Sequence, residues 1–217
     1  MAQRTSDLGR TLASAGGAAL AGTIRLIAAV RPAAKPLHPR GDVVRGRLTR
    51  TGSGAPTGSP WLDTAGSDEV LVRRSRAVGL PEPLPDIHGL AVRVPLENGR
   101  YGDLLLAMTG LGTVTRHLLT AGRSPGSRPL TTLLPYKTPT GALLVAATAT
   151  GEDSYELLAA RLGGEWRPFG RLELADGSGP DEPVSFDPVR NTLPGLDNYP
   201  WVRRLREPSY ATARHSR

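Results

Sequence analysis

The sequence contains no cysteine, and this absence removes several kinds of chemistry at once. Disulfide bonds, thiolate metal sites, iron–sulfur clusters and cysteine nucleophiles are all excluded. Aromatic residues are scarce, at 5% of the 217 residues. No aromatic motif interleaves with the arginines, so the stacking of bases that nucleic-acid binding uses is poorly supported. Nucleic acid is therefore not an expected partner.

Long hydrophobic runs are also lacking. The most apolar stretch, AGGAALAGTIRLIAAV at 15–30, is too short to span a bilayer and is interrupted by Arg25. A secretory signal is weakly supported, because Asp7 dilutes the positive start. We expect instead an amphipathic helix that begins near Ser6 and ends before Pro32, no membrane span, and by default a cytoplasmic location.

Positive charge and turn-forming residues are abundant. The formal net charge is +7, most of it from arginine, and the sequence pI is near 10.5. A basic protein favours anionic partners, and the guanidinium group binds carboxylates and phosphates in a bidentate manner. The 26 glycines and 20 prolines indicate short elements joined by tight turns.

Short apolar runs follow the N-terminal segment at regular spacing. Alternation of apolar and polar residues, clearest in LAVRVP and RLELAD, suits half-buried antiparallel strands. The predicted strands are 42–49, 69–75, 89–95, 102–108, 141–149, 155–162 and 170–176. Residues 97–103 are predicted to form a hairpin turn and 111–121 a short helix. The sequence thus predicts an α+β protein in which a helical segment, 1–32, precedes a single antiparallel β-barrel domain, 33–217.

No phosphate-binding loop, zinc-protease motif, nucleophile elbow or metal-ligand cluster occurs in the sequence. Four blocks are nevertheless informative in order: LHPRGDVVRGRLTR, VLVRRSRAVG, DIHGLAVRVPLENGRYGDLLLA and RLREPSYATARHSR. Together they resemble the heme catalases. That family has His-x-x-Gly before the first barrel strand, an arginine-rich strand, Asp-x-x-Gly-x-Ala-Val-Lys leading through a hairpin into Asp-Leu, and Arg-x-x-x-Tyr on a C-terminal helix.

The matched span runs from about residue 33 to the C-terminus, with 110–182 matched only loosely. Because the chain is far shorter than an ordinary catalase, it is most similar to the small catalase-related heme proteins. These include mini-catalases and relatives that process hydroperoxides, such as allene oxide synthase. The resemblance implies heme b as cofactor, hydrogen peroxide or an organic hydroperoxide as substrate, and an unknown electron donor. Association into a homo-oligomer is possible.

The resemblance makes Tyr210 the proximal ligand of the heme iron and Arg206 its catalytic partner. A tyrosine binds ferric iron as phenolate, although its free pKa is ~10, so a neighbouring cation must favour loss of the proton. Arg206 precedes Tyr210 by four residues, which places both on one face of a helix. An anionic oxygen ligand favours the ferric state and peroxide chemistry.

The resemblance also assigns the other side of the cofactor. His38 corresponds to the distal base that moves a proton between the two peroxide oxygens. Three cations, Lys35, Arg73 and Arg217, correspond to the contacts of the heme propionates.

One position departs from the family pattern. Ala107 stands where catalases have the asparagine that positions the peroxide. We therefore expect weak catalase turnover, and chemistry of the peroxidase type. The alternative is a catalase-like barrel that has lost heme and binds nucleic acid or another anion through its basic surface.

Overall fold

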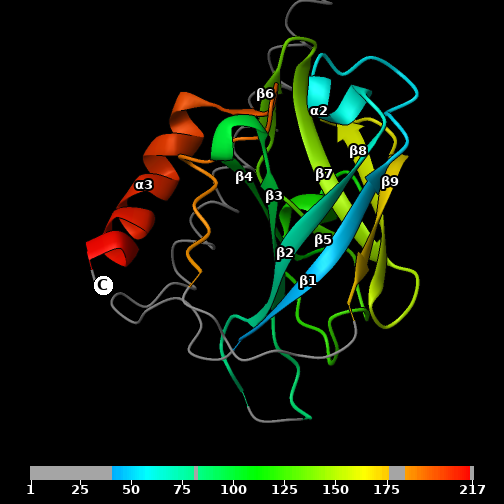
Figure 1. Ribbon diagram of the computed structural model, residues 1–217. Coiled ribbons are helices and arrows are strands. Elements are labelled where there is room, and N and C mark those ends of the chain that lie inside the picture. Colours follow the sequence, from blue (N-terminus) through cyan, green and yellow to red (C-terminus); the bar gives the residue numbers. More distant parts are fainter. Residues whose placement is uncertain (1–40, 81–82, 176–183, 216–217) are drawn as a thin grey trace, which may run out of the picture. The chain divides into compact units, whose positions relative to one another are not determined.

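The computed structural model of the protein describes residues 41–80, 83–175 and 184–215, all within one compact unit that starts at residue 36 (Figure 1). The helix expected within residues 1–32 lies outside this part of the chain. Among the described residues, no helix has the length and apolar character needed to cross a membrane.

Antiparallel strands dominate the described part of the chain. The strands are β1 (Gly41–Arg50), β2 (Gly66–Arg76), β3 (His88–Pro95), β4 (Tyr101–Met108), β5 (Leu130–Thr131), β6 (Tyr136–Thr138), β7 (Gly141–Ala149), β8 (Ser154–Arg161), β9 (Arg167–Leu174) and β10 (Asp197–Asn198). The helices are α2 (Pro60–Asp63), α3 (Pro200–His215) and the single 3-10 turns η1 (Glu97–Gly99) and η2 (Thr115–His117). All seven predicted strands are present, each shifted by a few residues at most.

Eight of these strands close into a barrel. Their order is β7-β5-β4-β3-β2-β1-β9-β8, and β8 pairs back onto β7 (Figure 1). The short strands β6 and β10 continue the sheet beyond β7. Closure gives each barrel strand a hydrogen-bonded neighbour on both sides. The predicted antiparallel barrel is therefore confirmed.

The alternation seen in the sequence sorts side chains between the two faces of the barrel wall. In β3, His88, Leu90, Val92 and Val94 are buried, whereas the residues between them are only half-buried. The apolar members of this set, Leu90, Val92 and Val94, join apolar side chains from every other barrel strand in one core. Period-two patterning therefore determined which residues face inward.

A single helical turn, α2, contributes to the same core. Ser59 caps it: its hydroxyl accepts from the backbone N–H of Leu62 and donates to the carbonyl of Pro194. Trp61 then packs edge-on against Phe169, with ring centroids 5.9 Å apart. Both side chains are buried, so α2 supplies apolar area that the strands alone lack.

The hairpin turn predicted at 97–103 is confirmed. The 3-10 turn η1 joins β3 to β4, and Gly99 has φ +69°, a conformation that glycine adopts without steric penalty. Gly102 follows at the start of β4, where a β-carbon would overlap the side chain of Leu193. This close approach packs the segment before β10 against the hairpin.

The helix predicted at 111–121 is wrong. Only the turn η2 is helical there, and the flanking residues form turns and bends. Arg116 explains the difference: its side chain is buried, donates to the carbonyls of Gly112 and Gly164, and lies over the ring of Trp166. Tertiary contacts of the guanidinium group therefore hold a conformation that a regular helix does not permit.

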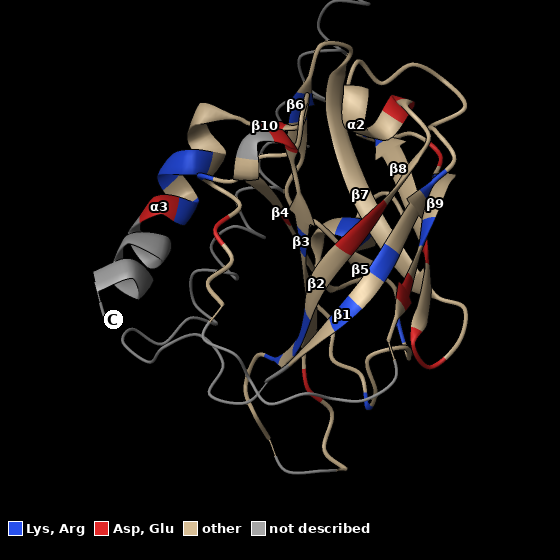
Figure 2. Ribbon diagram, viewed as in Figure 1, with Lys and Arg blue, Asp and Glu red and all other residues tan. Residues whose placement is uncertain are grey.

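Arginines and acidic residues are interspersed on β1 and β2 (Figure 2). Several of the charges are paired across strands, as in Arg47–Glu69 at 2.8 Å and Arg50–Asp68 at 3.1 Å. These pairs neutralise much of the arginine charge on this part of the barrel.

Candidate functional site

The outward face of strands β2, β3 and β4 holds two rows of residues, which we call the outer strand face. One row pairs Arg73 with Ala91 and Ala91 with Leu105; the next pairs Ser75 with Gly89 and Gly89 with Ala107. All six are half-buried. Gly89, Ala91 and Ala107 project little or no side chain from this face. Arg73 adds a guanidinium group to one of the rows.

The outer strand face brings together two residues singled out in the sequence. Arg73 was predicted as a propionate contact, and Ala107 stands where an amide was expected. They lie on the same side of the sheet in adjacent rows, with β3 between their strands. The two residues are 34 positions apart in the sequence, and this separation gives no indication that they lie close together.

Helix α3 contacts the polypeptide next to this face. The Nη2 atom of Arg206 donates to the carbonyl oxygen of Thr132 at 3.4 Å. Thr131, its neighbour, pairs with Ala107 across β4 and β5. One side chain of α3 therefore lies close to the end of the row that contains Ala107. The backbone of Tyr210 follows one turn later in α3.

The turn that contains Thr132, whose carbonyl accepts from Arg206, has an unusual backbone conformation. Leu133 has φ +62°, which is rare for a residue with a branched, bulky side chain. Its carbonyl bonds to Nδ1 of His117 at 2.8 Å, and its N–H donates to the hydroxyl of Thr131. These bonds stabilise the strained turn, so the carbonyl that accepts from Arg206 has a defined position.

His38, Lys35 and Arg217 lie outside the described residues. Among the residues that are described, no group of three or more His, Asp or Glu side chains is arranged to hold a metal ion.

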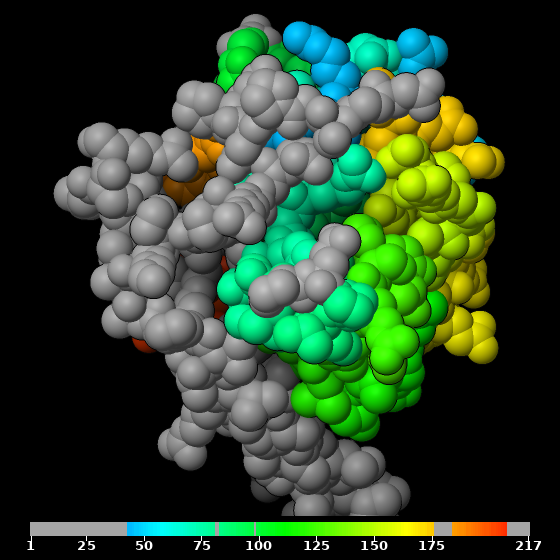
Figure 3. Space-filling model, turned by 90° about the horizontal axis from the view of Figure 1, so that it is seen from below, coloured from blue at the N-terminus to red at the C-terminus, as the bar shows by residue number. Residues whose placement is uncertain are grey.

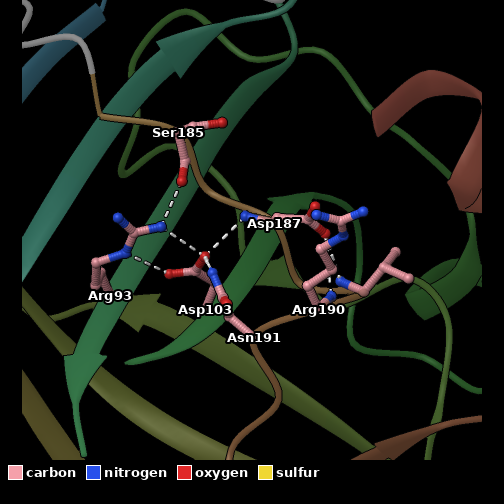
Figure 4. A network of polar contacts seen from close by, with 7 residues as sticks. Arg93, Asp103, Ser185, Asp187, Arg190 and Asn191 are labelled. Carbon is pink, nitrogen blue, oxygen red and sulfur yellow. Dashed lines mark hydrogen bonds and ion pairs between the residues drawn. The ribbon is translucent and has the colours of Figure 1, made fainter. Parts of the chain in front are cut away.

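A buried ion pair links the β3–β4 hairpin to the segment that leads into α3 (Figure 4). Arg93 donates to both carboxylate oxygens of Asp103, each at 2.8 Å, and the Asp103 side chain is fully buried. The same carboxylate accepts from the backbone N–H of Asp187 and from the side-chain amide of Asn191, each at 2.7 Å. Arg93 also donates to the carbonyl of Ser185.

This network has consequences for protonation and for position. The hydrogen bonds that Arg93 donates to Asp103 raise the pKa of Arg93, outweighing the opposing effect of burial. Two aromatic rings, those of Tyr101 and Phe186, lie 5.2 and 5.0 Å from the Arg93 guanidinium carbon. The ion pair therefore fixes the chain shortly before α3 begins. In the sequence, only the family motif marks Asp103, because two of its partners, Asp187 and Asn191, lie more than 80 residues away in the chain.

A second buried carboxylate, Asp86, organises the loop between β2 and β3. It accepts from the backbone N–H groups of Val78, Gly79, Leu80 and Ile87, at distances of 2.7 to 3.1 Å. Its own backbone pairs with Gly122, so this loop lies beside the loop that precedes β5 (Figure 3). Burial alone would raise the pKa of Asp86, but the four hydrogen bonds lower it below its ordinary value of 3.8.

We expect the Asp86 carboxylate to make stability dependent on pH. A lowered folded-state pKa means that ionised Asp86 stabilises the protein above pH ~4 and that this contribution disappears as the pH falls further. Asp86→Asn should cost about 1–3 kcal/mol at pH 7 and progressively less below pH 4. Urea unfolding from pH 7 to 2.5 measures this, with Glu69→Gln, an exposed carboxylate, as the control. A constant difference between wild type and Asp86→Asn across this range would contradict the assignment.

No family model matches the sequence, and none of the curated proteins matches it. Similarity is found among solved structures instead. The crystal structure of a fungal catalase aligns with a TM-score of 0.60 at 13% identity, covering 85% of this chain and 60% of the catalase. Catalase A from Saccharomyces cerevisiae aligns with a TM-score of 0.60 at 10% identity, covering 83% and 60%. The chain has a catalase-like fold.

The catalase-like barrel confirms the fold that the four sequence blocks implied. The chain spans 60% of the length of these two catalases, at an identity that establishes the fold alone. Membership of the small catalase-related subgroup, the cofactor and the activity stay predictions.

Proposed function

We propose that this protein is a heme-dependent oxidoreductase that acts on hydrogen peroxide or organic hydroperoxides, with weak catalase activity. The observation that supports the proposal best is the position of Arg206. It anchors α3, the helix that contains Tyr210, beside the outer strand face of a catalase-like barrel. The proposal places this chain among the small catalase-related proteins, which have shorter chains than ordinary catalases.

The residues of the outer strand face suit a flat, anionic cofactor. Gly89, Ala91 and Ala107 present little side-chain bulk, as a planar ring requires of a neighbouring surface. Arg73, half-buried on the same face, is suited to a carboxylate at the edge of the ring. Lys35 and Arg217 are proposed to complete the propionate contacts. Bound heme would supply a ferric iron able to take part in cleavage of the peroxide bond.

Tyr210 and Arg206 would form the proximal side. As phenolate, Tyr210 would bind the iron, and Arg206 would stabilise the negative charge by donating to the phenolate oxygen. The bond from Arg206 to Thr132 uses one of five N–H donors, which leaves donors for this second role. Each unit of pKa depression at Tyr210 requires about 1.4 kcal/mol of such stabilisation.

His38 would act on the distal side. A neutral imidazole there would accept the proton of the peroxide oxygen that approaches the iron and return it to the leaving oxygen. Because Ala107 supplies no amide to hold the second oxygen, productive orientation of hydrogen peroxide would be poor. Bulkier hydroperoxides, which orient through their own apolar part, and an external electron donor are therefore the better match.

Titration of the full chain with hemin tests the proposal. We expect one heme per chain, with the absorption of a high-spin ferric iron bound to tyrosinate, and oxidation of a dye by peroxide in excess of oxygen release. Failure to bind heme stoichiometrically would contradict the proposal and would favour the alternative of a barrel without heme.

A gain of function is expected at Ala107. Ala107→Asn would restore an amide beside the bound peroxide, and one added hydrogen bond of about 1.4 kcal/mol corresponds to about tenfold faster oxygen release. Oxygen-electrode measurements on hemin-loaded protein provide the rate. Ala55→Asn, at an exposed loop position, is the matched control. Equal rates in the two variants would show that Ala107 does not face the peroxide.

A further inference from the structure

A pocket of about 200 Å³ lies between the β3–β4 hairpin and the segment that precedes β10. Its lining is mainly polar and comes from both sides: Leu96, Arg100 and Tyr101 from the hairpin, and Arg190, Asn191 and Thr192 from the segment. None of these residues belongs to the proposed heme site. The pocket therefore needs an explanation of its own.

Both walls of the pocket are anchored to the buried pair Arg93–Asp103. On one wall, the side-chain amide of Asn191 donates to Asp103, and the Asn191 carbonyl accepts from the Asp103 N–H at 2.9 Å. On the other, the Arg93 guanidinium lies over the Tyr101 ring. A site held in this way keeps its shape when empty, so little ordering is required on binding.

The positive charges of the pocket come from two arginines. Arg100 and Arg190 are both exposed, and neither forms an ion pair with a carboxylate of the described part of the chain. Asp103, which accepts from Asn191 of the pocket wall, is already paired, because both of its carboxylate oxygens accept from Arg93. The structure pairs other arginines across strands, as in Arg74–Asp153 at 2.7 Å. What sets Arg100 and Arg190 apart is that they line one pocket from its two sides.

Hydrogen bonds to the backbone of the 187–191 turn hold Arg190 at the pocket. The carboxylate of Asp187 accepts from the N–H groups of Val189 and Arg190, at 3.0 and 3.1 Å, and the Asp187 carbonyl accepts from Asn191 (Figure 4). This closed turn fixes where the Arg190 side chain leaves the backbone. The hairpin wall is closed in the same manner, because the N–H of Leu96 donates to the carbonyl of Arg100 at 2.8 Å.

From this arrangement we propose that the pocket is a binding site for a small phosphate-type oxyanion, either inorganic phosphate or a phosphomonoester. Two guanidinium groups offer paired N–H donors to a dianion, and the hydroxyls of Tyr101 and Thr192 add further donors. The volume admits a phosphate group with a few waters or a short organic part. The site does not depend on whether the barrel binds heme.

Titration of the isotope-labelled full chain with sodium phosphate at constant ionic strength tests this site, with backbone amide signals of the pocket residues as the readout. We expect saturable shifts in wild type. Removing one charge-assisted contact should weaken binding about tenfold or more in Arg100→Gln and in Arg190→Gln. Arg47→Gln, which removes an exposed cation outside the pocket, should bind as wild type does. Circular dichroism would verify that all three variants are folded.

Two results would overturn the proposal. One is equal affinity in Arg47→Gln and in the two pocket variants, because phosphate would then be bound by net charge alone. The other is an equal response to acetate, since a monoanionic carboxylate should not replace a dianion on two guanidinium groups. Glycerol phosphate in place of inorganic phosphate distinguishes the two sources of the ligand: tighter binding of the ester supports a phosphomonoester.

Discussion

Replacing Asp103 by alanine is expected to lower the free energy of unfolding by about 3–5 kcal/mol, the usual effect of removing one partner from a buried ion pair. Arg93, whose side chain is only 15% exposed, would keep its charge without a carboxylate. The N–H of Asp187 and the amide of Asn191 would also lose their acceptor. Urea unfolding monitored by fluorescence and by circular dichroism measures the change.

A matched pair of variants separates charge from hydrogen bonding at this site. Arg93→Met combined with Asp103→Leu removes both charges, so it should recover part of the loss, while the two donors on the 185–191 segment stay unsatisfied. Glu69→Ala breaks an ion pair whose side chains are 64% and 69% exposed, and should cost less than about 1 kcal/mol. An effect of Asp103→Ala as small as that of Glu69→Ala would contradict the anchoring role.

Loss of heme is the expected result of replacing Tyr210 by phenylalanine, if the proposed function holds. Phenylalanine has no oxygen to bind ferric iron, so the tyrosinate absorption should vanish and hemin should bind weakly and without defined stoichiometry. Arg206→Gln should retain heme with a weaker iron–tyrosinate interaction, because the phenolate would lose a charge-assisted hydrogen bond. Absorption spectra and heme content per chain are the measurements.

Tyr199→Phe is the control for this experiment. Tyr199 immediately precedes α3 and stacks on Trp201, with ring centroids 6.3 Å apart, a contact that phenylalanine preserves. Its heme content should equal that of wild type. Equal heme content in Tyr210→Phe and Tyr199→Phe would exclude Tyr210 as the iron ligand, without affecting the phosphate proposal, which rests on other residues.

Local features of the sequence determined the strands and the hairpin. Alternation in β3 identified Leu90, Val92 and Val94 as inward-facing, because successive side chains of a strand point to opposite faces. Gly99 marked the turn, because its positive φ is readily available only to glycine. The barrel itself was predicted from the spacing of such strands together with the four family-like blocks.

Only the tertiary structure decided the rest, since those features depend on residues that are distant in the chain. The helix predicted at 111–121 does not form, because the buried guanidinium group of Arg116 contacts Gly164 and Trp166 instead. No sequence pattern links the pocket arginines, Arg100 and Arg190, which the fold alone places at one pocket. Periodicity reports which face of an element is buried, but the partner across a contact is set by the packing of the whole barrel.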